Sequence, residues 1–144
     1  FPTRRAPDRL EVILPRDTAD QDERHYVRIV EHFYQLGIQP DWWKLPPLRP
    51  ENWRTISQHI EHFDPECRGI LILGLDAPES ELKAGFAAAA DAPWVKGFAV
   101  GRTIFGEPSR QWLAGNYNDS QLIDAVKEKY LALIGFWREY RPAH

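Results

Sequence analysis

Lys44 is the strongest candidate for a reactive side chain in this sequence, because of its type and its position. It follows two tryptophans and precedes Leu45 and two prolines, so it leaves a predicted strand in an apolar neighbourhood. Such a neighbourhood disfavours the ammonium form of lysine, and the resulting amine can attack a carbonyl to form a Schiff base. A lysine that extends to solvent or pairs with a carboxylate is the alternative interpretation.

Glu11 is the second candidate, because it is a carboxylate in an otherwise aliphatic run. Buried acids are rare unless they meet a cation or a hydrogen-bond donor. Strand alternation puts Glu11 and Ile13 on one face, which is either the enclosed side of the sheet or the helix layer. On the enclosed side Glu11 could orient Lys44 or move a proton. A structural ion pair is the alternative.

Two glycine-containing turns suggest a phosphate site. Gly74 ends one predicted strand, and Gly101 with Arg102 ends the next. Glycines let backbone N–H groups approach an anion, and arginine adds a forked positive charge. In parallel α/β barrels the turns after the last two strands commonly bind phosphate. The alternative is that Gly101 permits a tight turn and Arg102 faces solvent.

Composition excludes several classes of function. The net charge of −3 predicts no nucleic-acid partner and no anionic membrane surface. No apolar run reaches the roughly 18–20 residues that span a bilayer. Cys67 is the single cysteine, so neither an internal disulfide nor a multi-cysteine metal site is expected, and a reducing cytoplasm is the default.

Other polar residues are predicted to be structural. The five histidines form no ligand-like group, so we expect no metal. Asp76 is expected to cap the following helix, and Glu23 to lie on a solvated helix face.

The elements that must position these residues recur about every thirty residues, the length of one βα unit. Four β-rich runs are predicted at residues 10–14, 41–45, 69–74 and 95–101. Helices are predicted at residues 20–36, 50–63 and 78–90, with a short helix at 108–115 and a long one capped by Ser120 that runs to Arg138.

Alternating strands and helices predict an α/β fold with a parallel sheet, in one domain spanning residues 1–144. The first turn lacks a Gly-rich phosphate fingerprint, which weakens a dinucleotide-binding fold. We therefore predict the C-terminal half, strands 5–8 with their helices, of a (β/α)8 barrel. Four units cannot close a barrel, so further strands or a partner are expected. The absence of Met predicts that the chain begins inside a longer protein or was processed.

Three segments resemble a known family: residues 37–47 (GIQPDWWKLPP), 68–79 (RGILILGLDAPE) and 95–108 (VKGFAVGRTIFGEP). They are similar to the aldolase-like domain that follows a 5-dehydro-2-deoxygluconokinase in a bifunctional protein of bacterial myo-inositol catabolism. More distantly, the chain resembles class I tagatose-1,6-bisphosphate aldolases. Asp41 to Lys44 matches their Asp-x-x-Lys with its Schiff-base lysine, Gly101 and Arg102 match their phosphate-binding pair, and Glu11 falls near their strand-five glutamate.

The resemblance implies cleavage of 6-phospho-5-dehydro-2-deoxygluconate to dihydroxyacetone phosphate and malonate semialdehyde. Lys44 would form the iminium, and Glu11 or a residue of the missing half would move the proton. Arg102 with the Gly74 and Gly101 backbones would hold the phosphate. No metal or other cofactor is implied. The implied partners are the kinase and the other barrel half of the full-length protein, with a homo-oligomer as a further possibility.

Two alternatives belong to other classes of function. A non-catalytic phosphosugar-binding or scaffolding module would keep the phosphate turns without a reactive Lys44. An isomerase would use Glu11 as its base and would form no adduct that borohydride can trap.

Overall fold

The chain is an α/β unit built on one parallel sheet. The computed structural model describes residues 6–14 and 22–141. Its strands, hydrogen-bonded side by side in chain order, are β1 (Ala6–Glu11), β2 (Pro40–Leu45), β3 (Gly69–Leu73) and β4 (Val95–Ala99). Its helices are α1 (Arg24–Gln35), α2 (Pro50–Phe63), α3 (Glu79–Ala88), α4 (Arg102–Leu113) and α5 (Asp119–Tyr140). All three strand pairs are parallel, so the predicted α/β fold with a parallel sheet is confirmed.

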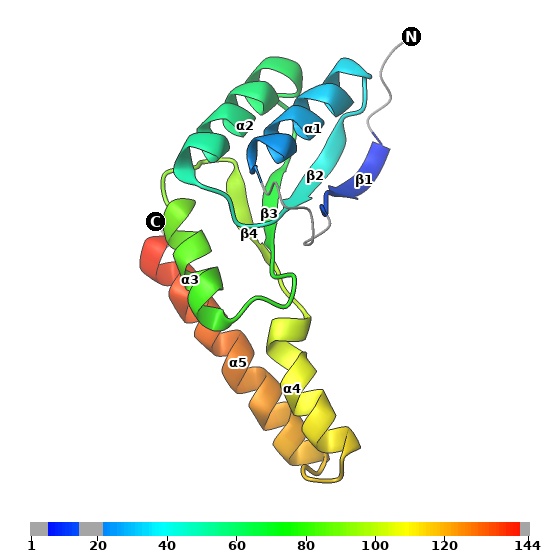
Figure 1. Cartoon of the computed structure of the whole chain (residues 1–144), viewed down its shortest axis with the longest axis vertical. Helices are drawn as coiled ribbons and strands as arrows, with labels where there is room; N and C mark the ends of the chain where they lie inside the picture. Colours follow the sequence, from blue (N-terminus) through cyan, green and yellow to red (C-terminus); the bar gives the residue numbers. More distant parts are fainter. Residues whose placement is uncertain (1–5, 15–21, 142–144) are drawn as a thin grey trace.

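The helices cover one face of the sheet. Figure 1 shows α1, α2, α3 and α5 on the same side of the strands, as right-handed crossovers between consecutive parallel strands require. Trp43 of β2 packs against Tyr34 of α1, and Phe98 of β4 packs against Phe86 of α3 and Trp137 of α5. The opposite face of the sheet is uncovered within the described residues.

Alternation along the strands decides which side chains enter the core. On β2, Trp43 and Leu45 are fully buried, whereas Trp42 and Lys44 between them are only partly buried. On β3, Ile70 and Ile72 are fully buried in the same layer. The core therefore lies between the sheet and the helices, and Trp42 and Lys44 point to the uncovered face.

The C-terminal helices form a hairpin that extends past the sheet. α4 continues in the direction of β4 beyond the strand ends, and α5 returns beside it to pack against α3 (Figure 1). Asn118 begins α5 with a capping box, in which its side chain accepts a hydrogen bond from the Gln121 N–H while Gln121 bonds back. The prediction that Ser120 caps this helix was therefore wrong by two residues.

Two predicted elements are misplaced. β1 begins at Ala6 and ends at Glu11, four residues before the predicted start at residue 10 and three before the predicted end at residue 14, because its pairing with β2 starts at Ala6. The helix predicted at Pro108 begins instead at Arg102, since the Gly101 carbonyl accepts hydrogen bonds from the N–H groups of residues 104 and 105. Pro108 lies buried inside α4, where it lacks the N–H that an internal helical residue donates.

Candidate functional site

Lys44 and Glu11 meet on the uncovered face of the sheet. The two residues are register partners on neighbouring parallel strands, and Lys44 Nζ lies 3.5 Å from Glu11 Oε2. Neighbouring Trp43 points the other way, where its indole N–H donates to Tyr34 Oη at 2.7 Å. Of the two faces that the sequence left open for Glu11, the helix layer is therefore excluded, and Glu11 lies on the face that no described helix covers.

The surroundings of Lys44 are less apolar than its sequence context predicts. The side chain of Lys44 is 22% exposed and that of Glu11 is 41% exposed. Leu71 of β3 is the next residue in register on the other side of Lys44. The ion pair considered as the alternative for both residues is therefore present, and their catalytic roles stay predictions.

Gly74 lies in a tight turn directly after β3. It is buried, and a Cβ atom at this position would lie 2.8 Å from Val100 Cγ1. The next two residues, Leu75 and Asp76, have positive φ angles of 49° and 61°, which are uncommon for residues other than glycine. Close packing against Val100 explains the glycine by itself, and the predicted phosphate role stays untested.

Arg102 is the first residue of α4 and not the last of a strand, which corrects its predicted position. Its guanidinium Nη1 lies 2.9 Å from Asp76 Oδ2. Thr103 Oγ1 also donates to the Ala77 carbonyl oxygen at 2.8 Å. These two contacts tie the turn after β3 to the start of α4. Asp76 does not cap α3, whose N-cap residue is Pro78, so that prediction was wrong.

A shallow hollow opens at the same end of the sheet. Its volume is about 520 Å³, and it is lined by Pro47, by the turn residues 74–78 and by Glu81. Pro47 comes three residues after Lys44, so the hollow begins close to the lysine strand. The carboxylates of Asp76 and Glu81 repel an anion, whereas the N-terminus of α4 and Arg102 attract one. Phosphate binding here requires Arg102 to exchange Asp76 for the phosphate.

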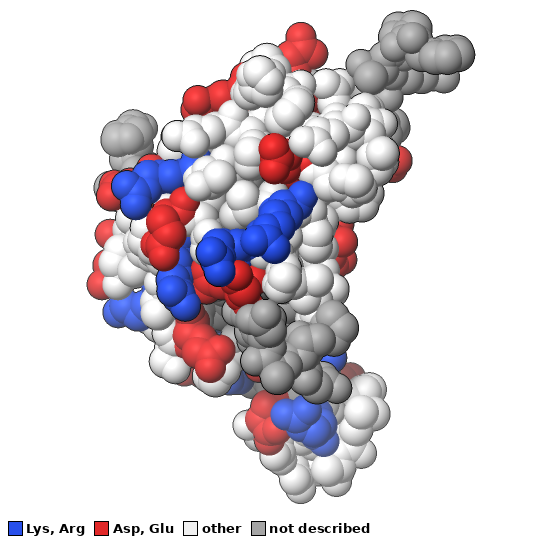
Figure 2. Space-filling view, turned by 45° about the horizontal axis from the view of Figure 1, so that its top comes forward, with Lys and Arg blue, Asp and Glu red and all other residues white. Residues whose placement is uncertain are grey.

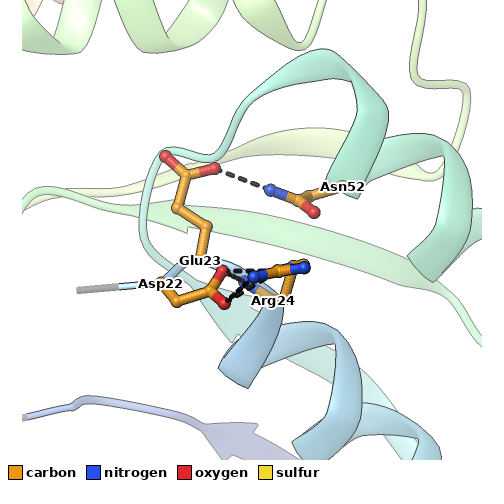
Figure 3. Close-up of polar contacts among 4 residues, drawn as sticks. All are labelled: Asp22, Glu23, Arg24 and Asn52. Carbon is orange, nitrogen blue, oxygen red and sulfur yellow. Dashed lines mark hydrogen bonds and ion pairs between the residues drawn. The ribbon is translucent and has the colours of Figure 1, made fainter. Parts of the chain in front are cut away.

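A second polar cluster fixes the loop that follows Lys44. Glu23 Oε2 accepts hydrogen bonds from the Arg49 N–H and from Asn52 Nδ2, both at 2.8 Å. Figure 3 shows the Glu23 side chain reaching toward Asn52, while Asp22 and Arg24 pair with each other. Glu23 thereby joins the start of α1 to the start of α2. The prediction of a solvated helix face for Glu23 was wrong, because partners 26 and 29 residues away cannot be found from local sequence.

Replacing Glu23 by alanine is expected to lower the free energy of unfolding by about 1–2 kcal/mol, since the buried amide of Asn52 loses its acceptor. Urea denaturation followed by circular dichroism measures the loss. Glu51→Ala, at an exposed position in the first turn of α2, is the control, with an expected change within about 0.5 kcal/mol. Equal effects of the two variants would contradict the role of Glu23.

Asp22, the residue before Glu23, pairs with Arg24 at 2.7 Å. The hydrogen bond from the Arg24 side chain, followed by that from the Arg24 N–H, lowers the pKa of Asp22 to about 2. Figure 2 shows lysine, arginine and acidic side chains interspersed on the face in view, with no large area of one sign.

Across residues 6–14 and 22–141, no three His, Cys, Asp or Glu side chains are arranged to hold a metal ion. None of the described helices is both long and apolar enough to cross a lipid bilayer.

Comparison with known families gives one match over almost the entire chain. The model of the family described as "Uncharacterized protein conserved in bacteria (DUF2090)" matches residues 7–141. No curated protein matches the chain.

Proposed function

The chain belongs to the DUF2090 family, and we propose that it acts as a class I aldolase on a phosphorylated keto-sugar acid. The substrate of this proposal is 6-phospho-5-dehydro-2-deoxygluconate. The products are dihydroxyacetone phosphate and malonate semialdehyde. The resemblance of residues 37–47, 68–79 and 95–108 to aldolases supports the choice of substrate.

The observation that carries the proposal is the pairing of Lys44 with Glu11. The two groups lie 3.5 Å apart on the sheet face that no helix covers. In parallel α/β barrels the catalytic groups come from strand ends that face the interior. A carboxylate at this distance can accept the ammonium proton and release the amine that attacks the carbonyl.

The reaction proceeds through a Schiff base. The Lys44 amine condenses with the C5 ketone of the substrate and releases water, which leaves an iminium. A base, for which Glu11 is the nearest candidate, removes the proton of the C3 hydroxyl, and the C3–C4 bond breaks to release malonate semialdehyde. The electron pair of that bond enters the enamine, C4 takes up a proton, and water hydrolyses the remaining iminium to dihydroxyacetone phosphate.

The phosphate is proposed to bind where Gly74, Gly101 and Arg102 meet. Anchoring the phosphate would hold the ketone against the amine, and such positioning lowers the barrier substantially. The α4 N-terminus adds backbone N–H donors directed at an anion. Asp76 then acts as the competitor that occupies Arg102 when no phosphate is present.

A closed barrel completes the proposal. The strand order β1-β2-β3-β4, with the crossover helices on one face of the sheet, supports the proposal that the chain forms one half of a (β/α)8 barrel. A second set of four parallel strands would cover the face that carries Lys44 and would exclude water from it. Exclusion of water strengthens the electrostatic interactions of the site.

The direct test measures dihydroxyacetone phosphate released from the substrate, by coupling it to NADH oxidation with glycerol-3-phosphate dehydrogenase. Release dependent on the protein supports the aldolase. Binding of the substrate without any release would favour the non-catalytic phosphosugar-binding module.

Variants at the ion pair next to the hollow test the phosphate site. Arg102→Gln is expected to raise KM about tenfold or more, because it removes a charged hydrogen bond to the phosphate. Asp76→Asn is expected to lower KM, because it frees Arg102. Steady-state kinetics measure both. A Gln variant with unchanged KM would contradict the assignment of Arg102.

A further inference from the structure

The turn that follows β3 holds two neighbouring residues in an unusual backbone conformation. Leu75 and Asp76 have φ angles of 49° and 61°, and the Gly74 carbonyl oxygen accepts a hydrogen bond from the Ala77 N–H at 2.9 Å. A four-residue turn with positive φ at both central positions belongs to type I′, which glycine, asparagine and aspartate favour. Leucine is unfavourable there, because its Cβ crowds the following carbonyl oxygen. Surrounding contacts must therefore hold Leu75 in this conformation.

The two ends of the turn are fixed by packing. Gly74 is buried so close to Val100 that a Cβ atom on the glycine would lie 2.8 Å from Val100 Cγ1. At the other end Ala77 packs against the core, and its carbonyl oxygen accepts the hydrogen bond from Thr103 Oγ1 at 2.8 Å. A change of backbone conformation is therefore confined to the two residues between these ends.

The Asp76 carboxylate ties the middle of the turn to α4. Its Oδ2 lies 2.9 Å from Nη1 of Arg102, and the two side chains are 47% and 64% exposed. Ion pairs as exposed as this one contribute little to stability. A phosphate can bind both arms of a guanidinium at once, so it competes well for Arg102. The contact that holds the middle of the turn is therefore one that a phosphate can break.

We propose that residues 74–77 form a phosphate-operated switch, in which a bound phosphate takes Arg102 from Asp76 and lets Leu75 and Asp76 leave the left-handed region. The arrangement described above is the closed state, in which the carboxylates of Asp76 and Glu81 line the hollow and disfavour an anion. A ligand shifts such an equilibrium only through its different affinities for the two states. Arg102 supplies that difference, because it is already occupied in the closed state.

This inference rests on the proposed function, because the phosphate that operates the switch is that of the sugar-acid substrate. It adds a selection by the phosphate group, since a neutral ketose has no charge with which to displace Asp76 from Arg102. Dihydroxyacetone phosphate is therefore expected to open the turn, whereas dihydroxyacetone at the same concentration is expected to leave it closed.

Nuclear magnetic resonance of isotope-labelled protein follows the turn without any turnover. The cross-peak between the amide and Hα protons of Leu75 is strong while φ is positive, and it is expected to weaken as inorganic phosphate is added. Sodium chloride at matched ionic strength is the control, because salt by itself screens an exposed ion pair. Phosphate that does not bind, or that binds while Leu75 keeps its positive φ, would overturn the switch. An equal change with chloride would also overturn it.

Two variants of Leu75 test the role of the strained backbone. Leu75→Gly is expected to weaken the binding of inorganic phosphate about threefold or more, because glycine adopts a positive φ readily and so stabilises the closed state. Leu75→Ala is the matched control, since it removes the side chain but keeps the Cβ, and its affinity is expected to stay within about twofold of the original. Isothermal titration measures both. Equal affinities of the two variants would contradict the switch.

Cleavage of the substrate, assayed on the same protein, separates the two hypotheses. A protein that releases dihydroxyacetone phosphate while Leu75 keeps its positive φ in the presence of phosphate sinks the switch alone. A protein whose turn responds to phosphate but that cleaves no substrate sinks the aldolase alone.

Discussion

Lys44→Arg is expected to reduce the rate of substrate cleavage about a thousandfold or more, because a guanidinium keeps the positive charge but cannot form an iminium. The ion pair with Glu11 can persist in the variant, so the fold and substrate binding should be retained. Steady-state release of dihydroxyacetone phosphate measures the rate, and isothermal titration measures binding.

Lys96→Arg provides the control for Lys44. Lys96 is also a strand lysine, but it is exposed at the start of β4, two strands away from Lys44. Its replacement is expected to leave the cleavage rate within about twofold of the original, as for surface changes away from a site. A Lys44→Arg protein that retains full activity would exclude Schiff-base catalysis by this residue.

Trp43→Ala is expected to lower the free energy of unfolding by about 3–5 kcal/mol, because it leaves a large cavity in the core. Trp43 is 0% exposed, and its ring meets Tyr34 at a centroid distance of 5.4 Å. The variant also removes the donor to Tyr34 Oη, whose pKa burial raises above its ordinary value. Urea denaturation at neutral pH measures the change.

Trp42→Ala is the neighbouring control on the other face of β2. Trp42 is only partly buried in the single chain, so its loss is expected to cost less than half as much as that of Trp43. Equal costs for the two tryptophans would contradict the assignment of the helix-facing and uncovered sides of β2. That assignment is also what directs Lys44 away from the helices.

The parallel sheet could be predicted because its strongest signals are local. The apolar runs at 69–74 and 41–45 each coincide with an observed strand to within one residue, and the Pro50 start and Phe63 end of α2 are confirmed. β1 was misplaced because edge pairing with β2, and not hydrophobicity, sets its position. The start of α4 was missed because Pro108 is a typical first-turn residue, whereas here it is packed inside the helix.

The part of the candidate site that lies on the strands could be predicted from the sequence, whereas the contacts made by loops could not. Glu11 and Lys44 meet because β1 and β2 are neighbouring parallel strands whose hydrogen bonding makes the two residues register partners. The Arg102–Asp76 ion pair and the Glu23 cluster join residues 26 positions apart or more through the packing of loops, for which no sequence pattern exists. The left-handed turn at Leu75 and Asp76 was equally hidden, since leucine rarely adopts a positive φ angle even though aspartate does so more often.

Reductive trapping tests the central claim most directly. The protein is incubated with dihydroxyacetone phosphate and borohydride, and any mass increase is located by peptide mapping. The account predicts a stable adduct on the peptide that contains Lys44, and its absence from the Lys44→Arg variant. An adduct-free protein that remains folded and binds dihydroxyacetone phosphate would contradict Schiff-base chemistry at this site.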